Sequence, residues 1–217
     1  SIDMILCDLP YGATMAKWDS QIDLDKLWEQ YKRIVKEDGN ILLTAIQPFT
    51  NSLILSNKKM FRYEMIWEKS KATGYPDVKY RPMRKHENIL CFSYAAMVYL
   101  SKIRGKYFPQ NLVEINKKRT IGKGKSTEIM SKYGLAHEGR EYIQKYTNYP
   151  NSILQFPSEN KCKHPTQKPI ALFEYLIKTY TNENDLVLDN CIGSGTTAIA
   201  CINTNRKFIG FENNEKY

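Results

Sequence analysis

Apolar residues along this chain fall into two repeating patterns. Short apolar runs predict buried strands, and apolar side chains three and four residues apart predict amphipathic helices. The predicted strands cover residues 2–8, 40–46, 63–68, 88–94, 186–190 and 207–211, and the predicted helices cover residues 23–36, 51–57, 169–181 and 196–203. Asp38-Gly39 is expected to end the first helix. Strands that alternate with helices predict an α/β fold with a doubly wound, mostly parallel sheet.

Two stretches interrupt this alternation. Residues 69–87 contain a glycine, two prolines and six Lys or Arg residues, so we expect a long loop there. From about residue 95 to residue 160 the periodicity weakens, and basic, aromatic and glycine residues are interleaved. Loops of this length are usually functional or disordered, and we interpret this segment as an insertion with a role of its own.

The composition is that of a globular chain, and its charge is concentrated in one segment. Of 217 residues, 42% are hydrophobic and 25% are charged, and no apolar run approaches the ~18 residues of a membrane span. Residues 101–168 contain 14 Lys or Arg and 5 Asp or Glu, whereas the rest contains 18 of each, so the net charge of +9 lies wholly in this segment. The asymmetry favours a polyanion partner, most simply nucleic acid, with a solvated basic surface as the alternative.

The cysteines indicate a reduced protein. None of the five forms a C-x-x-C pair, and an odd count without a framework indicates a reducing cytosol. Cys162 lies near His164, but no second pair of ligands accompanies them, so we expect no metal site.

The stretch "ILCDLPYG", residues 5–12, ends the first predicted strand with an acid, a proline and an aromatic residue. Such residues form ordinary turns, and this interpretation stays open on the stretch alone. The same residues would present Asp8 and Tyr11 together at the end of a strand.

A second stretch, "VLDNCIGSGTTAIA" at residues 187–200, has the pattern of a nucleoside site. Gly193 and Gly195 lie between a strand and a helix, where glycine lets the backbone turn sharply and approach a ligand. Glu212 ends the next strand, at the place where nucleoside-binding sheets hold ribose hydroxyls. The third glycine of the dinucleotide pattern is missing, so a pyrophosphate site is not supported.

A third stretch, "TIGKGKST" at residues 120–127, superficially resembles a phosphate-binding P-loop. The pattern requires a glycine five residues before Gly124, and Arg119 stands there, with no apolar strand before it. We therefore interpret the stretch as a basic loop and exclude a nucleoside triphosphatase on this evidence.

Four stretches in a fixed order resemble one family. They are "DLPYG" at residues 8–12, "HPTQKP" at 164–169, "LDNCIGSGTT" at 188–197 and "FIGFE" at 208–212. Together they resemble the S-adenosylmethionine-dependent amino-methyltransferases of DNA, in the permuted β-type order with the catalytic half first. The stretches "ATGY" (72–75), "RKHENILCF" (84–92), "YFPQ" (107–110) and "YPNSILQF" (149–156) are similar to adenine-specific members from bacteria and phages.

The resemblance implies a Rossmann-like methyltransferase sheet with an inserted basic target-recognition segment. Residues 1–94 would form the catalytic half, residues 95–160 the target-recognition insertion, and residues 161–217 the cofactor half. The implied reaction moves a methyl group from S-adenosylmethionine to the N6 amine of an adenine flipped out of double-stranded DNA. The resemblance also implies the cytoplasm of a bacterium or phage-infected cell, a restriction–modification context, no membrane, no metal and a homodimer.

The resemblance also assigns roles in the first motif. Asp8 and the main-chain carbonyl of Leu9 would accept the two amine hydrogens, which localises the nitrogen lone pair towards the methyl group. Pro10 would stiffen the turn, and Tyr11 would stack on the flipped base, a contact worth roughly 1–3 kcal/mol.

Two further sets of residues follow from the resemblance and the charge pattern. The expected cofactor-binding residues come from the glycine stretch, its following strand and the "HPTQKP" stretch: Asp189, Asn190, Cys191, Gly193, Ser194, Gly195, Thr196, Glu212, Thr166, Gln167 and Lys168. The expected DNA-binding residues are basic side chains of the two irregular stretches: Lys79, Arg81, Arg84, Lys85, Lys117, Lys118, Arg119, Lys123 and Lys125.

Two departures from the family pattern keep alternatives open. Leu9 replaces the first proline of the usual D-P-P-Y, and Asn190-Cys191 replaces the usual P-F, which removes an aromatic wall from the cofactor site. A cytosine-N4 enzyme and a DNA-binding module without catalysis are the alternatives to an adenine-N6 enzyme. The strand and acid that often contact the cofactor's adenine are expected outside the printed sequence, which we expect to be trimmed at both ends.

Overall fold

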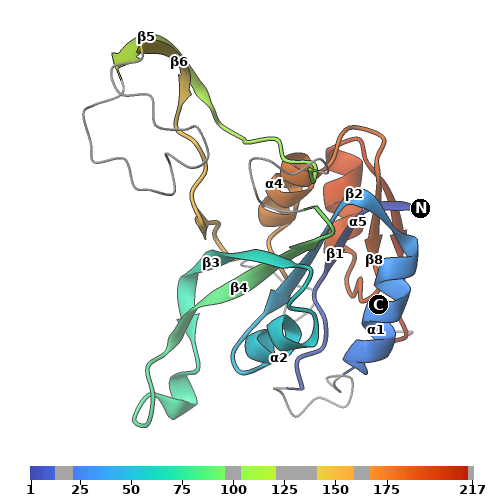
Figure 1. Ribbon diagram of the computed structural model, residues 1–217. Coiled ribbons are helices and arrows are strands. Elements are labelled where there is room, and N and C mark those ends of the chain that lie inside the picture. The colour runs from blue at the N-terminus through green and yellow to red at the C-terminus, as the bar shows by residue number, and fades with distance from the viewer. Residues whose placement is uncertain (13–21, 96–103, 121–140, 159–166, 215–217) are drawn as a thin grey trace. The chain divides into compact units, whose positions relative to one another are not determined.

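A computed structural model describes residues 1–12, 22–95, 104–120, 141–158 and 167–214 (Figure 1). The chain forms two compact units. The larger comprises Ser1–Phe108 and Asn151–Tyr217, and the smaller comprises Pro109–Pro150. Each unit is described by itself below.

The larger unit contains a seven-stranded sheet in the order β7-β3-β4-β2-β1-β8-β9. All pairings in this sheet are parallel except those of β4 with β2 and β3, so β4 alone runs against the other six strands. The prediction of a doubly wound, mostly parallel α/β sheet is confirmed. The strands are β1 (Ile2–Cys7), β2 (Val35–Ala45), β3 (Phe61–Thr73), β4 (Arg84–Ser93), β7 (Ile153–Gln155), β8 (Leu186–Asp189) and β9 (Lys207–Gly210).

Helices cover both faces of this sheet because the side chains of its central strands alternate between two apolar clusters. From β1, Ile5 and Cys7 face a cluster that contains α1 (Leu24–Ile34) and α2 (Phe49–Ser56). Met4 and Leu6 face the other cluster, which contains α4 (Ile170–Tyr180) and α5 (Thr196–Asn203) (Figure 1). None of the helices in the described ranges is long and apolar enough to cross a membrane.

The first helix ends earlier than its sequence predicts. The Asp23 side chain accepts hydrogen bonds from the first-turn N–H groups of Asp25 and Lys26, which satisfies donors that lack partners within the helix. The helix stops at Ile34, and β2 continues through Asp38-Gly39, so the prediction that these two residues end the helix is wrong. A register shift in the β1–β2 pairing, between Ile2 and Met4, accommodates the additional strand residues.

The predicted loop over residues 69–87 is also wrong. β3 extends to Thr73 and β4 begins at Arg84, so most of the stretch is a hairpin arm joined by a short 3₁₀ helix, η1 (Tyr75–Asp77) (Figure 1). Tyr75 and Tyr80 are exposed near its end. These two strands are held by their pairing with each other and not by burial in a core. They therefore lack the apolar run from which a strand is predicted, and their basic composition indicated a loop instead.

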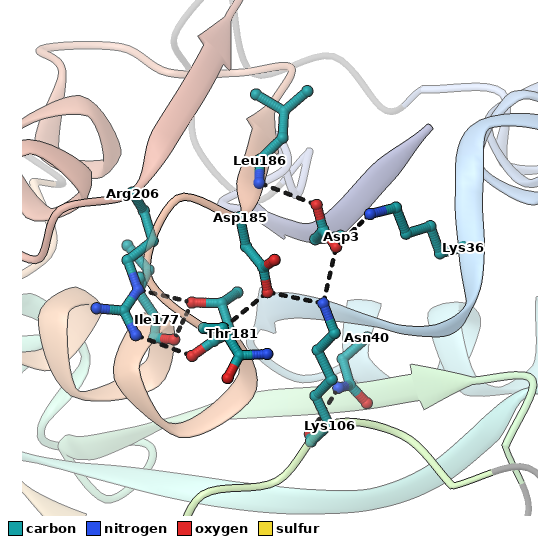
Figure 2. A network of polar contacts seen from close by, with 10 residues as sticks. Asp3, Lys36, Asn40, Lys106, Ile177, Thr181, Asp185, Leu186 and Arg206 are labelled. Carbon is teal, nitrogen blue, oxygen red and sulfur yellow. Dashed lines mark hydrogen bonds and ion pairs between the residues drawn. The ribbon is translucent and has the colours of Figure 1, made fainter.

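A network of charges lies at the amino ends of the parallel strands (Figure 2). The Asp3 carboxylate accepts hydrogen bonds from Lys36 Nζ at 2.6 Å, Lys106 Nζ at 2.8 Å and the Leu186 N–H at 3.0 Å. Lys106 Nζ also donates to Asp185 Oδ2 at 2.7 Å. Burial works to raise the pKa of Asp3, but these hydrogen bonds outweigh it and lower the pKa to about 2. The network ties β1 to β2, β8 and the segment that contains Lys106.

The smaller unit contains an antiparallel hairpin of β5 (Val113–Thr120) and β6 (Glu141–Thr147). Every described side chain of β5 is exposed, including those of three consecutive basic residues, Lys117, Lys118 and Arg119. This unit, residues 109–150, covers less of the chain than the predicted insertion of residues 95–160, because β7 pairs with β3 in the large sheet. The assignment of the segment to target recognition stays a prediction.

Candidate functional site

The candidate residues gather at the carboxyl ends of adjacent parallel strands. β1 lies between β2 and β8, and Ile5 pairs with Ile41 on one side and Leu188 on the other. Asp8 follows β1, and the glycine loop follows β8. The chain passes from β1 to β2 on one side and places β8 on the other, and ligands of α/β sheets bind at such switch points.

The Asp8 carboxylate is held by three side chains. Tyr11 and Thr44 both donate hydroxyl hydrogen bonds to Asp8 Oδ1. The two hydroxyl oxygens lie 2.9 Å apart, and because they have two protons for three contacts, both protons go to the charged acceptor. Lys168 Nζ donates to Asp8 Oδ2 at 2.5 Å. The carboxylate therefore has a fixed position, and it accepts bonds on both oxygens.

A chain of alternating charges continues from Asp8 into the protein. Lys168 Nζ lies 3.3 Å from Glu87 Oε2, and Glu87 Oε1 forms a second ion pair with Lys69. Burial works to lower the pKa of Lys168, but the charges of Asp8 and Glu87 outweigh it and raise the pKa. Burial works to raise the pKa of Glu87, but the charges of Lys168 and Lys69 outweigh it and lower the pKa. All of these shifts favour the charged forms.

The Tyr11 ring is half-buried, packs against the α1–α2 cluster, and lies 5.6 Å from the ring of Phe49 between centroids. Lys168 Nζ lies 5.7 Å from the Tyr11 ring centroid. Burial, reinforced by the negative charges of Asp8 and Glu87, raises the pKa of the Tyr11 hydroxyl well above its ordinary value. The hydroxyl therefore remains a neutral donor to Asp8.

The glycine loop after β8 has the backbone shape of a ligand-binding turn. Gly193 has a φ of +50° and Gly195 a φ of +88°, conformations that side chains other than glycine rarely adopt. A Cβ atom added at either position would meet nothing within 4 Å, so the loop is open on that side. The Gly193 N–H donates to Glu212 Oε2 at 2.8 Å, which joins the loop to the chain after β9.

Asp189, the last residue of β8, holds this loop through hydrogen bonds. Its oxygens accept a 3.0 Å hydrogen bond from the Cys191 N–H and another from the Thr197 hydroxyl. The residue is buried, and its burial raises its pKa to about 6 against the effect of these two bonds. Asn190 Oδ1 accepts a hydrogen bond of 2.5 Å from the Tyr31 hydroxyl of α1. The two residues thus fix the loop to β8, α5 and α1.

A family model described as DNA methylase, of the N6/N4 type, matches residues 2–217. The chain belongs to this family. Two DNA methylase relatives match all of it: the DNA adenine methyltransferase YhdJ of Escherichia coli K12 is 26% identical over 240 residues, and the type II methyltransferase M.HpaI of Haemophilus parainfluenzae is 27% identical over 230 residues. The chain spans 74% of the length of YhdJ and 66% of that of M.HpaI.

Solved structures of DNA methyltransferases have the same fold. A complex of M1.HpyAVI with SAM matches with a TM-score of 0.61 and 25% identity, covering all of this chain and 85% of the other. The cytosine-N4-specific PvuII DNA methyltransferase matches with a TM-score of 0.65 and 17% identity, covering all of this chain and 77% of the other.

The expected cofactor residues of this DNA methylase differ in where they lie. Gly193, Ser194, Gly195 and Glu212 lie on the open loop and the chain beside it, whereas Asp189 and Thr196 are buried beneath it. The remaining members are the half-buried Asn190, Cys191 and Gln167, the buried Lys168, which contacts Asp8, and Thr166, which lies outside the described residues together with Cys162 and His164.

The first motif and the DNA-binding set are placed as follows. The Leu9 side chain is buried in the α1–α2 cluster, so it adds a core contact where the family's proline would stand, and Pro10 is half-buried beside it. Within the described ranges, no three His, Cys, Asp or Glu side chains are grouped as a metal site. Of the basic residues, Lys79, Arg81, Arg84 and Lys85 lie on the β3–β4 arm, Lys117, Lys118 and Arg119 lie on β5, and Lys123 and Lys125 lie outside the described residues.

Sequence reasoning missed two residues of the site. Thr44 is the one hydroxyl in the apolar run "NILLTAI", and Glu87 is the acid that opens the apolar run of β4. Leu43 pairs with Cys7, so Thr44 stands level with Asp8, and the antiparallel β4 starts where β2 ends, since Ala45 pairs with Asn88. For Thr44, the available signal was a polar residue near the carboxyl end of a buried strand. Glu87 lies near the amino end of β4, and only the antiparallel pairing of β4 with β2 brings it to the site.

Proposed function

We propose that this DNA methylase transfers a methyl group from S-adenosylmethionine to the N6 amine of an adenine in double-stranded DNA. The observation that carries the proposal is the position of Asp8, a fixed carboxylate that follows the strand adjacent to the one bearing the open glycine loop. An amine and a methyl donor bound at neighbouring strand ends would meet between them.

The loop after β8 fits S-adenosylmethionine. Its open side and its two left-handed glycines allow close approach of a ligand, and the incomplete glycine pattern suits a nucleoside without a pyrophosphate. Gly193, Ser194 and Gly195 would hold the methionine part, with Gln167 near its carboxylate, and Glu212 would hold the ribose hydroxyls. When bound, the cofactor supplies a methyl carbon on a sulfonium, whose sulfur leaves with the electron pair.

Asp8 would accept one N–H of the target amine, and the Leu9 carbonyl would accept the other. A carboxylate has about four acceptor positions. Among the described contacts, Tyr11, Thr44 and Lys168 take three of them, which leaves one on Oδ2 for the amine. Two acceptors hold the nitrogen lone pair towards the methyl carbon. As the new N–C bond forms, the surplus N–H proton leaves the nitrogen for solvent.

Tyr11 would stack on the target base, which must leave the duplex to reach Asp8. The hydrogen bond from its hydroxyl to Asp8 fixes the ring beside the acceptor. Stacking on a ring that is already held costs little side-chain entropy, so the contact would help to keep the base out of the duplex.

Two exposed basic elements would bind the DNA backbone: the arm with Lys79, Arg81, Arg84 and Lys85, and the β5 strand with Lys117, Lys118 and Arg119. Lysine and arginine contacts to phosphates give affinity that falls with salt. We further propose a restriction–modification role in the cytoplasm of a bacterium or phage-infected cell, and a homodimer, as expected from the sequence motifs.

The proposal of adenine rather than cytosine rests on the aspartate at position 8, which resembles the adenine type. Both target bases offer an exocyclic amine with two hydrogens, so the geometry around Asp8 suits either. The test is incubation with unmethylated DNA and radiolabelled S-adenosylmethionine, followed by digestion to nucleosides. Label in N6-methyladenine supports the proposal, and label in N4-methylcytosine replaces it with the cytosine activity. Absence of label with intact DNA binding would identify a binding module.

A further inference from the structure

We propose that Glu87 is a positioning residue for methyl transfer. Its negative charge offsets the effect of the Lys168 ammonium on the Asp8 carboxylate, so that Asp8 remains a strong acceptor. The inference rests on the proposed function, since it concerns the strength of Asp8 as the acceptor for the target amine. Glu87 lies in the stretch "RKHENILCF", which shares in the family resemblance, but the resemblance gave it no catalytic or cofactor-binding role. It is a buried carboxylate at the start of β4, and buried carboxylates are rare unless they are paired.

The contacts place Glu87 between two lysines. The side chains of Lys168 and Glu87 are 6% and 10% exposed, and that of Lys69 is 11% exposed, so solvent screens this part of the network weakly. Four charges then alternate in order: Lys69, Glu87, Lys168 and Asp8. Their sum is zero, and only the Asp8 end carries a side chain with substantial exposure, at 24%.

The order of charges decides how strongly Asp8 can attract an amine. An ammonium at 2.5 Å from Asp8 Oδ2 withdraws negative charge from the oxygen that has the remaining acceptor position. Glu87 counteracts this effect because its Oε2 attracts the same ammonium, at 3.3 Å. Lys168 can then fix the rotation of the Asp8 carboxylate without cancelling its charge.

The first test is Glu87→Gln, which keeps the size of the side chain and removes its charge. The single-turnover rate of methyl transfer, with enzyme in excess over DNA, should fall by about 10- to 100-fold, the range seen when the residue that orients a metal ligand is removed. The KM for the cofactor and the Kd for DNA should change by less than about twofold, since Glu87 touches neither in the proposed site. A fall in rate with both affinities retained separates positioning from a general loss of structure.

The double variant Glu87→Gln/Lys168→Met gives the sharper readout. Without Glu87 the unbalanced ammonium weakens Asp8, so removal of Lys168 as well should raise the rate above that of Glu87→Gln alone. Lys69 loses the same partner in both variants, and its effect therefore cancels in the comparison. Recovery of this kind is a coupling between neighbours, which a merely structural role of Glu87 would not produce.

Two further variants keep the test informative if Glu87→Gln folds poorly. Lys69→Met leaves Glu87 with Lys168 alone, and the rate should then equal or exceed that of the wild type. Glu68→Gln is the matched control, because Glu68 pairs at 3.0 Å with Lys85 on the same arm but is more exposed. Its rate should stay within about twofold of the wild type.

The outcomes separate this inference from the proposed function. If the wild type places no label in adenine, the proposed function fails whatever the variants do. With an active wild type, an unchanged single-turnover rate in Glu87→Gln overturns the inference. So does a loss that the double variant fails to relieve, or a rate in Lys69→Met that falls as far as in Glu87→Gln.

Discussion

Each end of β1 has an aspartate that pairs with lysine, but the two aspartates differ in how much of their surface the protein covers. At the amino end, Asp3 pairs with Lys36 and Lys106, and at the carboxyl end Asp8 pairs with Lys168. The side chain of Asp3 is 5% exposed and that of Asp8 is 24% exposed. Asp3 also accepts a main-chain bond from Leu186, so its partners all belong to the sheet and its connections (Figure 2).

Under our proposal, one strand serves stability at its amino end and chemistry at its carboxyl end. Asp3 joins β1, β2, β8 and the chain around Lys106, segments far apart in sequence. Asp8 is also held firmly, by Tyr11, Thr44 and Lys168, but it retains exposed surface where an external donor could bind. An aspartate–lysine pair thus stabilises the fold when protein groups surround the carboxylate. It is a candidate site when the carboxylate keeps one exposed acceptor position.

The largest effect should come from Asp8→Ala. Removal of the acceptor should lower methyl transfer by at least about 100-fold, the scale of losing one preorganised polar group at a reacting atom. Lys168 keeps Glu87 as a partner, so the variant should remain folded. Single-turnover transfer of labelled methyl groups, with circular dichroism as the folding control, measures both effects. A variant that kept wild-type transfer would remove Asp8 from the proposed mechanism.

Asp3→Asn should reverse this result. The change leaves the half-exposed Lys36 without this carboxylate and leaves Lys106 paired with Asp185, so the free energy of unfolding should fall by about 2 kcal/mol. The transfer rate per folded molecule should stay close to that of the wild type, because Asp3 lies at the opposite end of β1 from Asp8. Urea unfolding gives the first quantity, and assays well below the unfolding midpoint give the second. A rate that fell with intact folding would show that the two ends are coupled.

The carboxyl end of the sheet was largely predictable, because its residues lie within local patterns. The α5 helix occupies the predicted residues 196–203, and Gly193 and Gly195 have the positive φ that their position between a strand and a helix indicated. Asp8 likewise follows a buried strand, as its apolar run predicts. In each case the residues that determine the local structure are adjacent in sequence.

The partners of these residues were not predictable in the same way. Thr44 and Glu87 meet Asp8 and Lys168 only through the order and register of β1, β2 and β4, which a single sequence does not reveal. The β3–β4 arm was missed for a related reason, since the strand signal in residues 69–87 depends on pairing between the two strands. Lys168 was assigned to the cofactor by motif alone, whereas its Nζ contacts Asp8.

The closed network should also show a defined pH dependence. The pKa of Asp3 is about 2 in the fold, below the ~3.9 of an unperturbed aspartate, so its stabilisation is complete above pH ~4 and is lost as the pH falls towards 2. The difference in unfolding free energy between the wild type and Asp3→Asn should shrink by about 2 kcal/mol over this range. Urea unfolding at a series of pH values measures it, and a difference that stayed constant would contradict the assignment.

The smallest effect should come from an ion pair whose side chains are about half exposed. Arg81 pairs with Asp77 on the β3–β4 arm, and their side chains are 58% and 46% exposed. Asp77→Asn should change the free energy of unfolding by less than about 0.5 kcal/mol, because water competes for both charges and salt screens them. It should not weaken DNA binding, since it removes a negative charge and leaves Arg81 available to phosphates. Urea unfolding and fluorescence anisotropy with a duplex measure the two quantities. A loss of stability as large as that of Asp3→Asn would mean that burial does not determine how much an ion pair of this protein contributes to stability.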